Sequence, residues 1–327
     1  MLTVYHTQNG FALYMEKNIK KTQVTHTLIL VLAAMIWGFA SVSQSVGAEY
    51  VEANTFLCVR SWIAVIFLMP VIAVMDRSRT RKGLPTGRPL NRTQRRVHLI
   101  GGISCGTALF FASAAQQIGI ADTTTAKAGF ITAMYVVLVP VLAIVLGRFP
   151  APRIWLCVVL GITGLYFLCM KDGIGSVGRG DLLMLLCAAL FSVQIMLVNH
   201  FSQIIDGVRL SRIEMLTEAV IATCAMLIFE TPTREALRLA LPALLYAGVM
   251  SSGVAYTLQI VGQEGLDPTI AALAMCLESV FSAVGGWLFQ GQSLTGRELF
   301  GCALMFSAIV FSQLPSPGRR QRGGKRL

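Results

Sequence analysis

Residues 123–147 read "TTTAKAGFITAMYVVLVPVLAIVLG", and no charged residue occurs between Gly129 and Gly147. An α-helix rises about 1.5 Å per residue, so about 20 apolar residues cross the roughly 30 Å hydrocarbon core of a bilayer. The stretch does not alternate polar and apolar residues as a membrane β-strand would. It therefore predicts a transmembrane helix that carries one lysine, Lys127, near its first end.

The composition of the whole chain agrees with this prediction. Of its 327 residues, 55% are hydrophobic and 13% are charged, whereas soluble domains average about 25% charged residues. So few polar side chains cannot cover a soluble globule of this size, and we infer an integral membrane protein. The net charge of +11 comes from the termini and from short segments between apolar stretches, so we expect no nucleic-acid partner.

Ten stretches are long and apolar enough to be transmembrane helices: 27–47, 54–75, 99–118, 123–147, 153–170, 181–199, 212–230, 240–261, 268–290 and 297–314. They predict an all-α integral membrane protein. The longest segment between them, 76–98, is rich in arginine and is expected to be disordered. Residues 1–14 are expected to be a start-site artefact or a disordered extension.

The distribution of positive residues predicts the orientation. With the N-terminus in the cytoplasm, the inside segments hold 20 lysines and arginines and the outside segments hold 5. Positive residues concentrate on the cytoplasmic side of membrane proteins. The bias therefore predicts a multi-pass protein with both termini in the cytoplasm. The two other positive residues, Arg60 and Lys127, lie within predicted spans.

The two halves of the chain resemble each other. "GFITAMYVVLVPVLAIVLG" (129–147) aligns with "AALAMCLESVFSAVGGWLF" (271–289), which sets Tyr135 opposite Glu278 when a small offset is allowed. With five spans in each half, the second copy enters the membrane in the opposite sense, as in many secondary transporters. We therefore expect four parts: a cytoplasmic N-terminal extension (1–26), a first five-helix repeat (27–170), a second five-helix repeat (171–314) and a basic cytoplasmic tail (315–327).

Motifs along most of the chain are similar to those of one transporter family. They are "AAMIWGFASVSQSVG" in the first span, "NTFLCVRSWIAVIFLMP" in the second, "TTTAKAGFITAMYVVLVPVL" in the fourth, and "SSGVAYTLQIVGQEGLDPTIAALAMCLESVFSAVGGWLF" in the eighth and ninth. In order and spacing they resemble EamA-type members of the drug/metabolite transporter superfamily. The resemblance covers nearly all of 27–314. It implies ten helices in two inverted repeats and the export of small metabolites across a bacterial inner membrane.

Glu278 is the first candidate site residue. It lies about ten residues after Pro268, which places it near the centre of the bilayer. An isolated carboxylate at that depth costs about 2.5–3.5 kcal/mol, so we expect it to face a water-filled cavity, to pair with a cation or to be protonated. One interpretation is a site for proton coupling or for a substrate amine. The alternative is a neutral acid that forms a hydrogen bond between helices.

Lys127 is the second candidate, and it lies about 6 Å inside the outer end of its predicted helix. Its side chain could extend back to the interface. Alternatively it points inward at the outer mouth of a cavity, where it would meet a substrate carboxylate or an acidic side chain. The small neighbours Ala126, Ala128 and Gly129 favour close helix packing and therefore the inward interpretation.

Three further charged residues within the spans need partners or water. Arg60 lies at a similar outer depth, and Glu49 and Glu52 in the adjoining outside loop are its expected structural partners. Glu214 and Glu218 are four residues apart, which places them on one face of a helix. That face is expected either to border a cytoplasmic vestibule or to anchor the helix end.

Uncharged polar residues within the spans are candidates for lining the passage: Trp37, Ser41, Gln44, Gln116, Gln117, Tyr135, Gln194, Asn199, Tyr256 and Gln259. Small-molecule sites combine apolar walls with a few such groups. We assign substrate binding or coupling to Glu278, Lys127, Trp37, Tyr135, Gln117, Gln194, Tyr256 and Gln259. The alternative for each uncharged residue is a hydrogen bond between helices.

Enzymatic signatures are weak in this sequence. "GISCG" (102–106) fits the nucleophile-elbow pattern, but that elbow requires a strand–turn–helix and this segment is a predicted helix. The chain lacks a GxxxxGK[ST] nucleotide loop and cysteine or histidine residues at metal-binding spacing. We therefore expect no enzymatic activity, no metal and no cofactor. The rival class is a membrane enzyme acting on a lipid or isoprenoid, which would need acids or histidines clustered at one interface.

The residues and the resemblance together predict a secondary transporter that moves a small metabolite by alternating access. One acid and one base in the passage would suit a zwitterion such as an amino acid. Its expected partners are that substrate, the lipid bilayer and protons, as a monomer or a homodimer.

Overall fold

The computed structural model describes residues 2–122, 125–170, 178–290 and 295–314, and every secondary-structure element in these ranges is a helix. The first half contains α1 (Leu2–Ala48), α2 (Ala53–Arg81), α3 (Arg92–Gly119), a 3₁₀ turn η1 (Ile120–Asp122), α4 (Thr125–Thr132), α5 (Tyr135–Val145) and α6 (Pro152–Cys169). The second half contains α7 (Arg179–Phe201), α8 (Gly207–Phe229), α9 (Arg234–Tyr246), a π-helix η2 (Ala247–Ala255), α10 (Tyr256–Gln263), α11 (Pro268–Met275), α12 (Glu278–Gln290) and α13 (Gly296–Gln313). The prediction of an all-α fold is confirmed.

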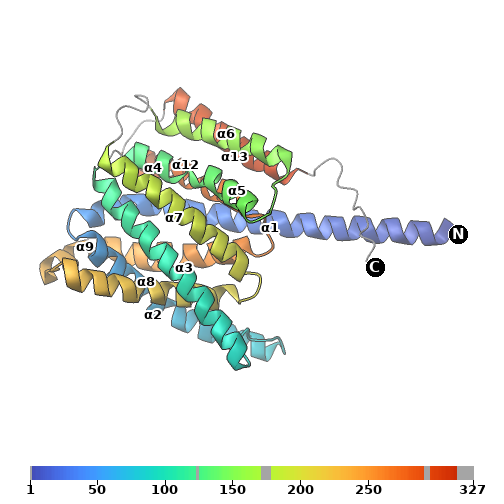
Figure 1. The fold of residues 1–327 in the computed structure, drawn as a ribbon, viewed down its shortest axis with the longest axis horizontal. Coiled ribbons are helices and arrows are strands. Elements are labelled where there is room, and N and C mark those ends of the chain that lie inside the picture. The colour runs from blue at the N-terminus through green and yellow to red at the C-terminus, as the bar shows by residue number, and fades with distance from the viewer. Residues whose placement is uncertain (1, 123–124, 171–177, 291–294, 315–327) are drawn as a thin grey trace.

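The helices pack as a bundle of membrane-length passages (Figure 1). Among the described residues, eight helical passages are long and apolar enough to cross a membrane. They are α1 from Thr22, α2, α3, the end of α4 with α5, α6, α7, α9 with η2 and α10, and α11 with the start of α12. The other two helices of comparable length, α8 and α13, carry charged residues within or at the start of their sequences. The arrangement is compatible with the ten expected spans.

The fourth passage of each half is broken at an equivalent place. In the first half the break falls at residues 133–134, between α4 and α5, and in the second half at residues 276–277, between α11 and α12. At both breaks the backbone hydrogen bonds tighten to three-residue spacing, as in Val136 N to Ala133 O and Ser279 N to Cys276 O. Such 3₁₀ stretches within a helix often mark functional hinges. The first break precedes Pro140, which lies inside α5.

The two repeats meet along several helix pairs, among them α3 with α7 and α8 and α1 with α12, and two further pairs lie at opposite edges of the bundle. α2 packs against α8 at one edge, and α6 packs against α13 at the other. The broken passages and α7 lie between these edges, together with α1 (Figure 1). The largest buried apolar cluster joins α1, α5 and α6 of the first repeat to α7, α11, α12 and α13 of the second.

The α6–α13 pair is held by close backbone contact. A Cβ atom at Gly164 would lie 2.7 Å from the carbonyl oxygen of Gly301, and a Cβ atom at Gly301 would lie 2.6 Å from that of Gly164. Real Cβ atoms do not approach so closely, so only glycine permits this crossing. Small residues at such crossings allow van der Waals packing in lipid, where the hydrophobic effect between helices is absent.

The segment 76–98 is ordered in the structure, so the expectation of disorder was wrong. α2 continues to Arg81, the chain turns with left-handed glycines at Gly83 and Gly87, and α3 begins at Arg92. The expectation rested on the arginines of this segment, but acidic side chains pair with them and hold the segment in place. Asp76 pairs with Arg88 and Arg209, and Asp206 pairs with Arg79.

α1 begins at Leu2, before the expected start of the first span at residue 27. Residues 2–14 are therefore helical rather than the disordered extension that was expected. No proline occurs between residues 2 and 69 to stop the helix. The first half of α1 projects beyond the bundle (Figure 1).

Candidate functional site

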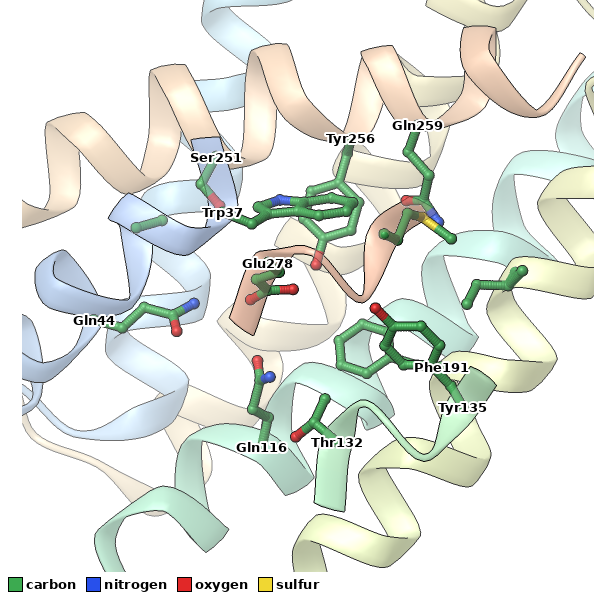
Figure 2. Close-up of a pocket in the computed structure, with 13 residues that line it drawn as sticks. Trp37, Gln44, Gln116, Thr132, Tyr135, Phe191, Ser251, Tyr256, Gln259 and Glu278 are labelled. Carbon is green, nitrogen blue, oxygen red and sulfur yellow. The ribbon is translucent and has the colours of Figure 1, made fainter. Parts of the chain in front are cut away.

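A small cavity lies where the two repeats meet, and it contains about 40 Å³ of space. A single water needs about 10–15 Å³ on the same measure, so the cavity holds only a few waters. The residues that line it come from both halves: Trp37, Ala40, Gln44, Gln116, Thr132, Tyr135, Phe191, Ile195, Ser251, Tyr256, Gln259, Met275 and Glu278. Figure 2 shows their side chains around one space.

Glu278 supplies the only acidic side chain among the described residues that line the cavity. It is the first residue of α12, directly after the break in the ninth passage, and it is partly exposed to the cavity. Within the described part of the chain, no hydrogen bond or ion pair joins its carboxylate to another residue. Figure 2 shows the carboxylate pointing into the space between Trp37 and Gln116. The carboxylate is therefore available to a cation, a proton or water.

The two helix breaks place matching residues at the cavity. Thr132 ends α4 and Tyr135 begins α5, whereas Met275 ends α11 and Glu278 begins α12. All four of these residues line the cavity. Tyr135 and Glu278 therefore occupy equivalent positions in the two halves, as the sequence alignment predicted. At each break, the last residue of one helix and the first residue of the next therefore line the same cavity.

Aromatic rings form another part of the cavity wall. Trp37 from α1 meets Tyr256 from α10 edge to face, with ring centroids 4.9 Å apart, and Phe191 and Tyr135 complete the set. The faces of such rings attract cations. The Nε1 atom of Trp37 is buried and has no hydrogen-bond partner among the described residues. The cavity wall thus offers the faces of aromatic rings and one N–H donor, Trp37 Nε1, that forms no hydrogen bond with the described residues.

Gln259 connects the cavity to a buried acid behind it. Its Nε2 donates to Gln194 Oε1 over 3.1 Å, and Gln194 Nε2 donates to Glu214 Oε1 over 2.8 Å. Gln259 lines the cavity, whereas Gln194 lies one hydrogen bond away from it. The Oε1 atom of Gln259 and the Oε2 atom of Glu214 are buried without partners among the described residues. Gln194 therefore supports the site from behind.

Several residues that line the cavity were not assigned from the sequence, and in one case the adjacent residue was assigned instead. Gln116 lines the cavity, but Gln117, the residue assigned as a substrate contact, is buried elsewhere in α3. A helix rotates by about 100° per residue, so adjacent glutamines cannot face the same space. Thr132 and Ser251 were not among the candidates. Ser251 belongs to the π-helix η2, and such turns occur frequently at functional sites.

The comparisons with known proteins identify the class of this chain. The model of the EamA-like transporter family matches residues 25–170 and, a second time, residues 178–313. The chain belongs to the EamA-like transporter family. A protein of Archaeoglobus fulgidus named as an uncharacterized transporter is 27% identical over 286 residues, which are 87% of this chain and 84% of that protein. A solved crystal structure with 18% sequence identity has the same fold, with a TM-score of 0.67 over 88% of this chain and 96% of that one.

As an EamA-like transporter, the chain is a multi-pass membrane protein built from two repeats, and its partners include the lipid bilayer and a small-molecule substrate. The family and the transporter relative indicate a protein that is not an enzyme. In the ranges that the structure describes, no group of three or more metal-binding side chains comes together.

The buried arginine of this EamA-like transporter has a different partner from the expected one. Arg60 donates to Glu218 Oε1 over 3.0 Å and to Ser113 Oγ over 3.1 Å, rather than pairing with Glu49 or Glu52. Ser61 donates to the second oxygen of Glu218 over 2.9 Å. Arg60 is 2% exposed and Glu218 is fully buried. The earlier expectation considered only residues near in sequence, but the partner comes from α8 in the other repeat.

Lys127 belongs to α4, and its side chain lies outside the part of the protein that the structure describes. Its helix ends at Thr132, which lines the cavity. The inward orientation of Lys127 therefore stays a prediction.

Proposed function

We propose that this transporter exports a small metabolite, such as an amino acid, across a bacterial inner membrane by alternating access. In this proposal the first repeat (27–170) and the second (171–314) expose the cavity to each side of the membrane in turn. The extension at 1–26 and the basic tail at 315–327 both lie in the cytoplasm. The excess of positive residues in the segments assigned to the inside supports this orientation.

The observation that carries the proposal is the Glu278 carboxylate, which faces the cavity between the repeats without a partner among the described residues. Ionisable groups inside the membrane are costly, and they mark substrate or ion pathways. Glu278 also begins a helix directly after a break. Discontinuous helices form the central sites of many transporters that are built from inverted repeats.

The chemistry of the wall suits the ammonium end of a zwitterion. The carboxylate of Glu278 would pair with an ammonium group, and the faces of Trp37 and Tyr256 would add cation–π attraction. Lys127 would then meet the substrate carboxylate at the outer mouth. The small volume of the cavity supports an occluded state, so a whole metabolite requires the repeats to move apart.

A proton is the proposed coupling ion. A charged carboxylate inside the membrane is costly when no cation is bound to it, so a proton is one way to neutralise it. Substrate and proton would then both interact with Glu278. A pH gradient would drive transport without ATP.

The test is transport into proteoliposomes with a panel of amino acids, amines and organic acids, with and without a pH gradient. Glu278→Gln is expected to abolish any response to the gradient, while Glu264→Gln, the same change at an exposed loop position, retains it. Normal transport by Glu278→Gln with unchanged pH dependence would overturn the assignment of Glu278. Transport of none of these compounds by the wild-type chain would overturn the proposed substrate class.

A further inference from the structure

One face of α2 is exposed along its length and changes from apolar to positively charged. Its apolar part consists of Ile66, Met69, Pro70, Ala73 and Val74, and Arg77, Ser78, Arg81 and Lys82 follow in the same spacing. Steps of three and four residues keep these side chains on one side of the helix. We call this set the α2 stripe.

The dimensions of the α2 stripe match one leaflet of a bilayer. From Ile66 to Arg77 the helix advances 11 residues, which is about 16 Å at 1.5 Å per residue. Half of a hydrocarbon core is about 15 Å thick. With Ile66 near the middle of the predicted span 54–75, the apolar part from Ile66 to Val74 covers about 12 Å of one leaflet. Arg77 would then lie near the level of the lipid phosphate.

The cations of the stripe border two hollows. One contains about 490 Å³ and is lined by Val74, Arg77, Ser78, Arg81 and Lys82. The second contains about 580 Å³ and lies between α2 and the loop that returns toward α3. Its lining consists of Ala73, Asp76, Arg77, Thr80 and Arg81 from α2 and of Thr86 and Arg88 from the loop. The loop converts one side of the helix into a groove with cations on both walls.

Acidic side chains of the described residues neutralise only part of the positive charge of this groove. Asp76 binds Arg88 through Nε at 3.0 Å and Nη2 at 2.9 Å, and its other oxygen binds Arg209. Asp206 is engaged by Arg79. In the ranges that the structure describes, Arg77, Arg81 and Lys82 contact no acidic side chain, so the groove has an excess of positive charge beside the lipid-facing stripe.

We propose that the groove at the end of α2 binds an anionic phospholipid, with its phosphate between Arg77, Arg81 and Arg88 and one acyl chain along the α2 stripe. Asp76 orients Arg88 toward the groove from the loop. The cations and the apolar stripe together match both ends of a lipid molecule, because cations near an anionic surface favour binding. The site is separate from the central cavity and independent of the transported substrate.

The test compares lipid binding to the purified full-length chain in detergent. Native mass spectrometry would measure the affinity for phosphatidylglycerol and for phosphatidylcholine, with glycerol 1-phosphate as a soluble head group. We expect the wild-type chain to bind phosphatidylglycerol more tightly than phosphatidylcholine and to bind glycerol 1-phosphate far more weakly, because the stripe contributes. Arg77→Gln/Arg81→Gln/Lys82→Gln should weaken phosphatidylglycerol binding on the order of 100-fold.

The matched control is Arg92→Gln/Arg95→Gln/Arg96→Gln, which removes the same charge from exposed arginines at the start of α3. We expect this variant to bind phosphatidylglycerol as the wild type does. An equal loss in both triple variants would show a general effect of charge and would overturn the proposal. So would equal binding of the two phospholipids by the wild type, or tight binding of the soluble head group. If the triple variant does not fold, Arg81→Gln/Lys82→Gln provides the same comparison with a smaller expected loss.

Discussion

Glu218 and Glu278 both lie in membrane-spanning helices of the second repeat, but their surroundings are opposite. Glu218 accepts hydrogen bonds from Arg60 and Ser61 on α2 and is sealed from solvent. Glu278 faces the central cavity and pairs with none of the described residues. The difference teaches that depth in the membrane does not decide what a carboxylate does. A carboxylate with hydrogen-bond partners inside the protein stabilises the fold. A carboxylate that borders a cavity can bind a substrate or a proton.

The surroundings of Glu218 belong to a larger polar contact between the repeats, which we call the α2–α8 seam. At one end of the seam, Glu230 accepts from the backbone and side chains of Asn54 and Thr55, with distances of 2.6–2.8 Å. At the other end, Asp76 binds Arg209. Arg60 and Glu218 lie between these ends. The seam therefore joins α2 to α8 at three levels, and we expect the two helices to move as one body.

The largest effect is expected for Glu218→Gln. This change leaves Arg60 charged and buried without its counter-ion, and breaking a buried pair from one side costs about 3–5 kcal/mol. Thermal unfolding in detergent would measure the loss. Arg60→Met/Glu218→Leu should recover most of the stability, because an apolar pair of similar volume replaces both charges. A single variant as stable as the wild type would contradict the structural role of Glu218.

A smaller effect is expected at the end of the seam. Glu230→Ala removes the acceptor of four hydrogen bonds at the first residues of α2 and should cost about 2 kcal/mol, because water replaces part of the loss. Denaturation of the purified variant would measure this value. Glu235→Ala, an exposed glutamate in the first turn of α9, is the control and should change stability little. Equal losses of stability in the two variants would contradict a stabilising role of Glu230 in the α2–α8 seam.

Glu278→Gln should alter stability by less than about 1 kcal/mol, because no described residue loses a partner. Its transport should nevertheless lose the response to a pH gradient, as argued above. The same two measurements on Glu218→Gln and Glu278→Gln would thus separate a structural acid from a binding acid. Unfolding of the Glu278→Gln variant would show that this carboxylate also holds helices together.

The smallest effect is expected for Glu214→Gln, one helical turn from Glu218. Glu214 accepts from Gln194 and contacts no cation among the described residues, so the neutral amide can accept the same hydrogen bond. We expect a stability change below about 0.5 kcal/mol. A loss as large as that of Glu218→Gln would show that Glu214 is ionised in the folded protein.

The sequence predicted part of the cavity, both from the aligned halves and from single polar residues within the spans. The pairing of Tyr135 with Glu278 followed from the repeat, and both residues begin a helix after a break. Trp37, Tyr256 and Gln259 were also predicted and line the same cavity. Gln117 was assigned to the site, but Gln116 lines the cavity, because the rotation of a helix about its axis depends on neighbours from the other repeat. Thr132 and Ser251 were missed, since small hydroxyl residues are common in membrane helices without a role in binding.

The sequence by itself determined that the chain lies in a membrane, that it has two similar halves and that it resembles EamA-type transporters. These properties follow from composition, periodicity and order, which are visible along one chain. Only the tertiary structure decided that Arg60 pairs with Glu218, that the arginines of segment 76–98 bind Asp76 and Asp206, and that Glu278 is left unpaired among the described residues. The reason is physical: the energy of a buried charge depends on atoms a few ångströms away, and in this fold those atoms come from the other repeat.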